Sequence, residues 1–312
     1  MSEPPTTVTY ASAADELRTL RDLVRWGASR FGEAELHYGH GTDNALDEAL
    51  ALALSALHLD HALPGDYLDA RLTRQERAAV LVLFRRRIDE RKPAPYLTHQ
   101  ARFAGLEFYV DERVLVPRSP IAELIEQGFE PWLSGVEIHR VLDLCTGSGC
   151  IAIACAYAFP DARVDAVDLS SQALEVARIN VGRHGLEERV ALIESDLFQA
   201  IPGERYDLIV SNPPYVSARE MSELPPEYRF EPSLGLAAGE DGLEVIRRIL
   251  ASAPEHLTPD GILVAEVGNS EAALQQRFPQ IPFLWLDFDR GGHGVFLLTA
   301  SQLAEHRDAF SD

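Results

Sequence analysis

The stretch Val141-Leu-Asp-Leu-Cys-Thr-Gly-Ser-Gly149 joins a short apolar run to a helical run at about 150–158. Glycines at such a strand-to-helix turn let the backbone come close to a ligand, and the amides of the following helix point toward that ligand. From Arg140 onward, strand-like runs alternate with helical runs, which predicts an α/β fold with a parallel sheet covered on both faces. Ligands of such sheets bind beyond the carboxyl ends of the strands, so Gly147 and Gly149 are predicted to border a ligand site.

The remaining elements are expected on both sides of this stretch. Further strands are predicted at 163–167, 190–193, 207–210 and 262–267, and helices at 171–184, about 240–252 and about 270–277. The chain closes with two strand-like runs, 283–288 and 294–298, and no helix separates them. This predicts an antiparallel hairpin at one edge of a seven-stranded sheet.

The ligand of the glycine loop stays open at this stage. Gly147-Ser-Gly-Cys-Ile-Ala152 fits the dinucleotide fingerprint G-x-G-x-x-A, with Asp168 near the expected distance. S-adenosylmethionine, NAD and tight packing of the turn without a ligand are all compatible with the loop. Asp143 favours S-adenosylmethionine, because an acid inside the first strand suits a cofactor's amino acid moiety or the loop amides better than a pyrophosphate.

Acidic residues also end the next two strands. Asp168 closes the second strand, where a carboxylate can accept hydrogen bonds from both hydroxyls of a ribose. Asp196 ends the third strand and could accept a hydrogen bond from an adenine amino group, with Leu197 as an apolar neighbour of the ring. The alternative for Asp196 is a helix N-cap.

Ser211-Asn-Pro-Pro-Tyr215 follows the fourth strand, and its two prolines are predicted to end that strand and stiffen the loop. The loop exposes the side-chain carbonyl of Asn212, the main-chain carbonyl of Pro213 and the aromatic face of Tyr215. Two acceptors and a stacking ring suit a planar amide or amino group as a methyl acceptor. The alternative is a proline-rich turn capped by asparagine that has no ligand. The position of this loop after two strands that end in acidic residues counts against the alternative.

The first hundred residues predict a small helical domain. Leu17, Leu20, Val24 and Phe31 recur at about helical spacing, and a second helical run covers 45–59. A third helix is expected to begin at Thr73, with Glu76 completing a capping box, and to end at Pro93. A hairpin with its turn at Gly105 is expected to link this domain to the next.

Composition restricts the partners. The net charge of the 312 residues is −21, and residues 101–312 carry 34 acidic against 16 basic side chains. Such a surface repels phosphate backbones and attracts a basic protein, although acidity could also serve solubility alone. No run of about 18 apolar residues and no signal peptide is found, so a cytoplasmic protein without a membrane contact is expected. The spacing of Cys145, Cys150 and Cys155 does not suit a metal site.

Taken together, the glycine loop and Asn212-Pro-Pro-Tyr215 resemble the class I methyltransferases that act on amide or exocyclic amino nitrogens. The linker Phe108-Tyr-Val-Asp-Glu-Arg-Val-Leu-Val-Pro-Arg-Ser-Pro120 narrows the resemblance to the protein-glutamine N5-methyltransferases. The resemblance covers about residues 15–300. Within that family, the linker resembles the members that methylate a glutamine of the third large-subunit ribosomal protein. Members that act on peptide-chain release factors usually read Pro-Arg-Pro-Asp-Thr-Glu where this chain reads Pro117-Arg-Ser-Pro-Ile-Ala-Glu123.

The resemblance implies three regions: a helical recognition domain at 1–100, a hairpin linker at 101–118 and a Rossmann-like catalytic domain with an antiparallel last strand at 119–312. It implies S-adenosyl-L-methionine as the cofactor and S-adenosyl-L-homocysteine as the product. The substrate it implies is a basic ribosomal protein, either free or in a ribosome-assembly precursor. The cofactor-binding residues implied are Asp143, Thr146, Gly147, Ser148, Gly149, Asp168, Leu169, Asp196, Leu197 and Asn212. The substrate-binding residues implied are Arg118, Asn212, Pro213, Pro214, Tyr215 and Glu231, with Asn212, Pro213 and Tyr215 as the catalytic residues.

The sequence departs from the methyltransferase pattern at one position, and alternatives remain for one residue pair and for the substrate. Cys145 stands where many methyltransferases have a first glycine, and Arg118 with Glu231 could form a surface ion pair instead of shaping the site. Release factors remain an alternative substrate, as does adenine N6 in DNA. The DNA reading needs base flipping and a basic surface, which the charge of residues 101–312 disfavours. A factor that binds the basic protein without catalysis would not need Asn212 and the glycine loop together.

Overall fold

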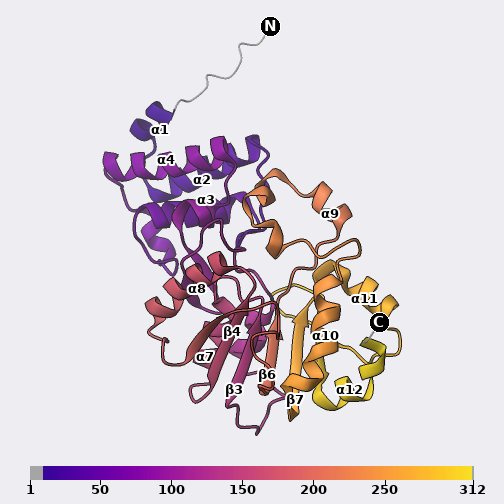
Figure 1. Ribbon diagram of the computed structural model, residues 1–312. Coiled ribbons are helices and arrows are strands. Elements are labelled where there is room, and N and C mark those ends of the chain that lie inside the picture. The colour runs from indigo at the N-terminus through magenta and orange to yellow at the C-terminus, as the bar shows by residue number, and fades with distance from the viewer. Residues whose placement is uncertain (1–9, 311–312) are drawn as a thin grey trace. The chain divides into compact units, whose positions relative to one another are not determined.

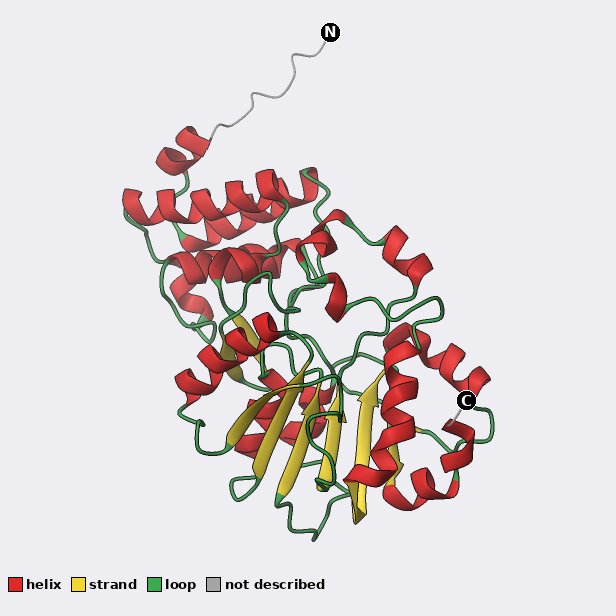
Figure 2. Ribbon diagram, in the orientation of Figure 1, coloured by secondary structure: helices red, strands yellow, loops and turns green. Residues whose placement is uncertain are grey.

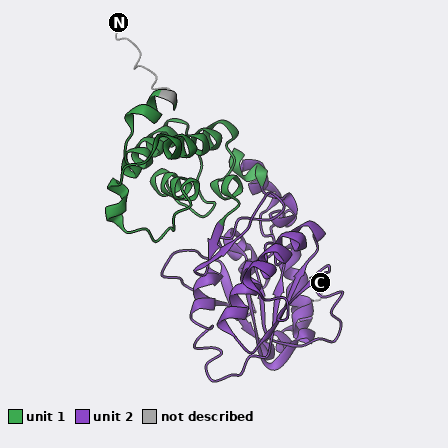
Figure 3. Cartoon of the chain, turned by 90° about the vertical axis from the view of Figure 1, so that its left-hand side faces the viewer, with its two compact units in different colours: residues 1–100, 225–230 green, residues 101–224, 231–312 purple. Residues whose placement is uncertain are grey.

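A computed structural model describes residues 10–310, and the chain divides into two compact units. Unit 1 comprises the described residues up to Gln100 together with Pro225–Phe230, and unit 2 comprises Ala101–Leu224 and the described residues from Glu231 onward (Figure 3). The helical domain expected from the sequence therefore acquires a short segment from much later in the chain.

Unit 1 is built from helices around one apolar core. Their bounds are α1 Tyr10–Glu16, α2 Leu20–Glu33, α3 Ala45–Ala56, η1 Gly65–Asp69, α4 Arg74–Glu90, α5 Ala94–Thr98 and, in the late segment, η2 Pro226–Phe230. The capping box predicted at the start of α4 is confirmed: Thr73 Oγ1 accepts from the Glu76 amide at 3.3 Å, and Glu76 Oε2 accepts from the Thr73 amide at 2.7 Å. Leu23, Phe31, Leu52 and Phe84 lie in the buried core of this unit.

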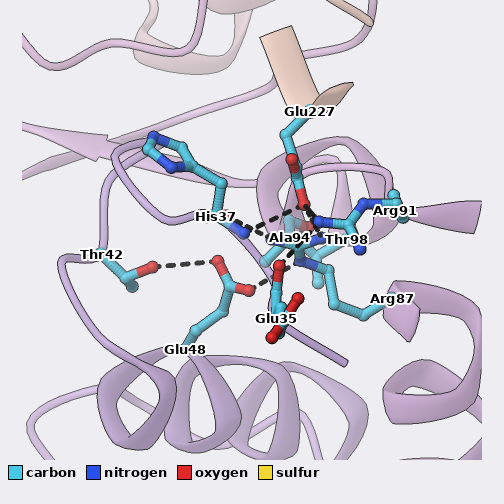
Figure 4. Close-up of polar contacts among 9 residues, drawn as sticks. All are labelled: Glu35, His37, Thr42, Glu48, Arg87, Arg91, Ala94, Thr98 and Glu227. Atoms are coloured by element: carbon cyan, nitrogen blue, oxygen red, sulfur yellow. Dashed lines mark hydrogen bonds and ion pairs between the residues drawn. The ribbon is translucent and has the colours of Figure 1, made fainter. Parts of the chain in front are cut away.

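A buried ion cluster joins η2 to the helices of unit 1 (Figure 4). Arg87 on α4 donates from Nε to Glu48 Oε1 of α3 at 2.7 Å, and its Nη1 lies 3.7 Å from Glu227 Oε1. Arg91 Nη2 pairs with the same Glu227 oxygen at 2.8 Å, and the His37 amide donates to it at 3.0 Å. Burial alone would raise the pKa of Glu227, but the His37 amide and the two guanidinium groups outweigh burial and hold that pKa below its ordinary value.

The core of unit 2 is a seven-stranded sheet in the order β5-β4-β3-β6-β7-β9-β8 (Figures 1 and 2). Its strands are β3 Arg140–Leu144, β4 Arg163–Asp168, β5 Val190–Glu194, β6 Tyr206–Ser211, β7 Leu257–Glu266, β8 Leu284–Trp285 and β9 Val295–Thr299. Strands β3 to β7 pair in parallel, and β9 pairs antiparallel with both β7 and β8. The α/β fold with an antiparallel hairpin at one edge is confirmed.

Helices cover both faces of the sheet because successive strand residues point to opposite sides. Val141 of β3 packs on the face that carries α6 and α7, while its neighbour Leu142 packs on the face that carries α10, α11 and α12. The helices of this unit are α6 Ile121–Glu126, α7 Cys150–Ala158, α8 Ser171–His184, α9 Ala218–Glu223, α10 Glu244–His256, α11 Glu271–Arg277 and α12 Ala300–Glu305. Short turns η3 Ser233–Gly235, η4 Gly268–Ser270 and η5 Arg307–Phe310 complete it.

The linking hairpin also forms as predicted. Strands β1 Ala101–Phe103 and β2 Leu106–Phe108 pair antiparallel, and the two turn residues Ala104 and Gly105 both have positive φ, as a two-residue hairpin turn of this kind requires. The edge strand predicted at 283–288 is shorter than expected, because only Leu284–Trp285 pairs before the chain reaches Asp289-Arg-Gly-Gly292. Helix α12 is an addition to the expected elements. Of the helices described, none has the length and apolar character needed to cross a membrane.

Candidate active site

The structure brings the predicted site residues to one edge of the sheet. Leu144 at the end of β3 lies opposite Val167 of β4 and Ser211 of β6, so the carboxyl ends of these strands are level. The glycine loop, Asp168, Asp196 and the Asn212 loop each end or follow one of these parallel strands. This edge is the place where ligands bind in open α/β sheets.

The glycine loop turns sharply between β3 and α7. Gly147 has φ 55° and Gly149 has φ 79°, both in the left-handed region that glycine enters without strain. At Gly149 a Cβ would also lie 3.2 Å from Cβ of Ala177, which is a tight contact. Cys145, which replaces the first glycine of many methyltransferases, has φ 60°, so its backbone adopts the conformation that glycine would provide.

Asp143 lies beneath this loop and is fully buried. Its Oδ2 accepts from Thr146 Oγ1 at 2.5 Å and from the Ala152 amide of α7 at 3.0 Å. Its Oδ1 is buried and has no hydrogen-bond partner among the residues described. Burial raises the pKa of Asp143 to about 7, although the bonds from Thr146 and Ala152 oppose this rise. An unpaired, buried carboxylate oxygen at this edge is costly unless a ligand completes it.

Asp168 at the end of β4 is held in one orientation by two backbone amides. Gly147 donates to Oδ2 and Ser170 donates to Oδ1, each at 2.8 Å. Each carboxylate oxygen keeps a second lone pair, so both can still accept from a ligand. Burial raises the pKa of this carboxyl, against the pull of these amides. The neighbouring Leu169 leaves 53% of its surface exposed.

Asp196 and Leu197 follow β5 as predicted, but the N-cap alternative for Asp196 is wrong. The residues after it form a turn and not a helix. The Asp196 carboxylate instead pairs with Arg248 of α10 at 2.7 Å through Oδ2. Leu197 is buried with φ 52°, a conformation that leucine adopts only when its surroundings hold it there.

The Asn-Pro-Pro-Tyr loop leaves the sheet directly after Ser211, whose hydroxyl donates to the Leu144 carbonyl of β3 at 2.8 Å. Asn212 and Tyr215 are half-buried and Pro213 is buried. The loop is closed on its far side by Val216, whose amide donates to the Leu236 carbonyl at 2.8 Å. These contacts hold Asn212 beside the end of β3 and therefore beside the glycine loop.

Arg118 and Glu231 come together across more than a hundred residues of sequence. Arg118 donates to both carboxylate oxygens, at 2.5 and 2.8 Å, and the Val116 amide adds a third bond at 3.2 Å. The ion pair given as the alternative is present, but it is not a surface pair because Glu231 is buried. The pair fixes the segment before α6 against the end of the loop that begins at Asn212.

Residues outside the predicted set complete this edge. Glu266 ends β7 and accepts hydrogen bonds from Tyr215 and Ser119, and Ser270 of η4 donates to the Tyr215 carbonyl. Glu266 carries the same signal that singled out Asp168, namely an acid at the carboxyl end of a parallel strand. Ser119 and Ser270 have no comparable local signal, because their partners lie far away in sequence.

Comparisons with known proteins agree with this architecture. A family model described as "Methyltransferase small domain" matches residues 130–224. A protein of Xanthomonas campestris pv. campestris is 55% identical over 95% of this chain and 96% of its own length. A protein of Xylella fastidiosa is 54% identical over 95% of each chain, and both are named "Ribosomal protein uL3 glutamine methyltransferase".

A solved structure of the T. thermophilus 16S rRNA N2 G1207 methyltransferase in complex with AdoMet and guanosine covers 64% of this chain and 49% of its own. The identity is 21% and the TM-score is 0.45. The sequence identity to the two relatives covers 95% of this chain. The chain belongs to the family of ribosomal protein uL3 glutamine methyltransferases.

Proposed function

We propose that this protein transfers a methyl group from S-adenosyl-L-methionine to the side-chain amide nitrogen of a glutamine in ribosomal protein uL3. The observation that carries the proposal is the placement of Asn212-Pro-Pro-Tyr215 at the carboxyl edge of the sheet, directly beside the glycine loop, in a chain 55% identical to a named relative. The reaction needs cofactor-binding and amide-holding groups at adjacent strand ends, and the loops proposed for these roles follow the paired strands β3 and β6.

The residues of the glycine loop suit the amino acid end of the cofactor. The unpaired Oδ1 of Asp143 is a natural acceptor for an ammonium group or for a water that bridges to one. The Cβ-free Gly147 and Gly149, with Thr146 and Ser148, would let the backbone approach the ligand at the start of α7. Asp168 with Leu169 would take the ribose hydroxyls.

The adenine end and the substrate amide would be held by the next two loops. Asp196 and Leu197 would lie by the adenine, although Arg248 already engages one oxygen of Asp196. The Asn212 side-chain carbonyl and the Pro213 carbonyl would accept the two hydrogens of the glutamine amide, and Tyr215 would stack on its plane. Arg118 and Glu231 would brace this loop through their ion pair, in which Glu231 is buried.

Catalysis would rest on alignment. When bound, the cofactor supplies a methyl group on a sulfonium, a leaving group that needs no prior activation. Acceptors on both amide hydrogens would increase the availability of the nitrogen lone pair. They would also orient that lone pair toward the methyl group, so the protein would contribute alignment and electrostatic stabilisation to the transfer. No strong base is required of this chain before transfer.

Cofactor affinity is expected to increase several-fold between pH 6 and pH 7.5. The pKa of Asp143 is raised to about 7, so lower pH protonates the carboxylate and removes the charge that attracts the cofactor's ammonium group. Across this range the amino group itself stays largely protonated. Calorimetric titrations at several pH values would measure the dependence, and Asp143→Asn should flatten it. An equally steep profile in Asp143→Asn would refute the assignment to Asp143.

Substrate capture is expected to weaken with salt. Residues 101–312 carry 34 acidic and 16 basic side chains, so attraction of a basic protein is screened as ionic strength increases. The KM for uL3 should increase between about 50 and 300 mM salt, because the Debye length shortens about 2.5-fold over this range. The kcat should change little. A KM independent of salt would show that the acidity has no part in recognition.

The proposal is tested by methyl transfer in vitro. Purified protein with labelled S-adenosyl-L-methionine is incubated separately with uL3, a peptide-chain release factor and duplex DNA. Label on a glutamine of uL3, located by mass spectrometry, is the expected result. Label on the release factor or the DNA alone would overturn the proposal and favour the corresponding alternative.

A further inference from the structure

Glu266 is the one acid at the site edge whose two oxygens both accept side-chain hydroxyl hydrogens within the part of the chain that the structure describes. Tyr215 donates to Oε1 at 2.9 Å, and Ser119 donates to Oε2 at 2.6 Å. The three residues come from three separate segments: the loop after β6, the end of β7 and the turn before α6. Glu266 is only 5% exposed, so this carboxylate joins the three segments below the surface.

The Tyr215 ring is held from a second direction as well. Gly268 has φ 44°, and a Cβ built there would lie 2.6 Å from Cε2 of Tyr215, so the ring packs directly on the backbone of η4. The Ser270 hydroxyl donates to the Tyr215 carbonyl at 2.8 Å. Backbone packing limits where the ring can be, and the hydroxyl bond to Glu266 decides how the ring is tilted within that space.

Burial of the Glu266 carboxylate at this position is energetically unfavourable by itself. Desolvation of a charged group is unfavourable unless hydrogen bonds offset it. Two hydroxyl donors supply such bonds, which are shorter and stronger when the acceptor is ionised. Ser119 in turn is oriented by its place at the start of α6, where the Ile121 amide donates to its hydroxyl oxygen at 3.2 Å.

We propose that Glu266 is a positioning residue for methyl transfer: it holds the Tyr215 ring in the plane on which the substrate amide stacks, and Ser119 fixes the carboxylate that does so. This rests on the proposed role of Tyr215 in holding the glutamine amide. Glu266 is buried, and the Tyr215 hydroxyl bond is the contact through which its carboxylate acts on the ring. A tilt of the ring displaces the amide nitrogen from the line of transfer, and misplacement of reacting groups by about 1 Å reduces rates up to about a hundredfold.

The test compares Glu266→Gln, Tyr215→Phe and the double variant, with Glu188→Gln as control. Glutamine keeps the shape of glutamate but offers one acceptor oxygen instead of two, and phenylalanine keeps the ring but removes the donor. Each single variant should reduce kcat about tenfold, with cofactor affinity and melting temperature nearly kept. Glu188 is exposed in the turn before β5, at the amino end of that strand, so its variant should match the parent.

The double variant decides whether the two residues act together. If Glu266 works through the Tyr215 hydroxyl, the double variant should be no slower than the slower single variant, because Tyr215→Phe removes the bond that Glu266→Gln weakens. Multiplied losses in the double variant would overturn the inference. So would a parent-like kcat in both single variants. Ser119→Ala provides a second test of the inference. It should reduce kcat less than Glu266→Gln does, and it should cause no further loss when it is combined with Tyr215→Phe.

The variant Tyr215→Ala tests separately whether the Tyr215 ring is needed for methyl transfer. If Tyr215→Ala loses turnover while Tyr215→Phe and Glu266→Gln keep it, the ring matters and its bond to Glu266 does not. In that case the inference about Glu266 is wrong and the proposed function stands. If Tyr215→Ala turns over like the parent, the proposed role of Tyr215 itself is wrong.

Discussion

Replacing Asn212 by alanine is expected to lower kcat about a thousandfold, equivalent to about 4 kcal/mol of transition-state stabilisation. The substitution removes the side-chain carbonyl that would hold one hydrogen of the substrate amide, at the edge where β6 ends beside the glycine loop. The Pro213 carbonyl and the Tyr215 ring would remain, but an amide held at one hydrogen can rotate out of line. Single-turnover methylation of uL3 measures the chemical step directly.

Cofactor binding separates this effect from general damage. Affinity for S-adenosyl-L-methionine, measured by calorimetry, should change little in Asn212→Ala, because Asp143, Asp168 and the glycine loop are untouched. Asn269→Ala is the matched control, since Asn269 is an exposed asparagine of η4 in the same unit. Turnover of Asn212→Ala within about threefold of that control, a difference of well under 1 kcal/mol, would refute the role of Asn212.

Replacing Arg87 by methionine is expected to destabilise unit 1 by about 3–5 kcal/mol. Arg87 and its partners Glu48 and Glu227 are all buried, and the guanidinium lies between the two carboxylates. Methionine fills much of the space but leaves Glu48 without its 2.7 Å partner, and Glu227 keeps only Arg91 and the His37 amide of the contacts described above. Hydrogen exchange of the amides of α3 and α4 reports the local free energy of unfolding in this unit.

The control lies two residues earlier on the same helix. Arg85 pairs with Asp89 at 3.0 Å, but both side chains are more than half exposed, and exposed pairs of this kind contribute less than about 1 kcal/mol. Arg85→Met should therefore change exchange in α3 and α4 only slightly. Equal effects of Arg85→Met and Arg87→Met would contradict the assignment of a structural role to the buried cluster.

The features that the sequence predicts well are local ones. The capping box of Thr73 and Glu76, the turn at Gly105 and the end of β6 before Pro213 depend on residues within a few positions of each other. The alternation of strands and helices then orders the parallel strands, and their level carboxyl ends bring together Asp168 and Asn212. This is why the cofactor and amide-holding residues could be proposed from the sequence.

The features that the sequence does not predict are long-range polar contacts. Ser119 meets Glu266 across 147 positions, and the His37 amide meets Glu227 across 190. Nothing in the residues around Glu227 distinguishes it from an ordinary surface acid of an acidic chain. The same limit explains Asp196, where a local rule allowed an N-cap but the pairing with Arg248 of α10 could be seen only in the fold.

The grouping of Pro225–Phe230 with the N-terminal helices has a consequence for how this chain can be divided. The polypeptide leaves the helical unit after Gln100, returns to it at Pro225 and leaves again after Phe230. A gene shortened to begin at codon 101 would therefore encode a catalytic fragment that still carries Glu227 without Arg87, Arg91 or the His37 amide. Exchange of the helical unit between relatives would need two segments instead of one, because its residues come from two separate stretches of the chain.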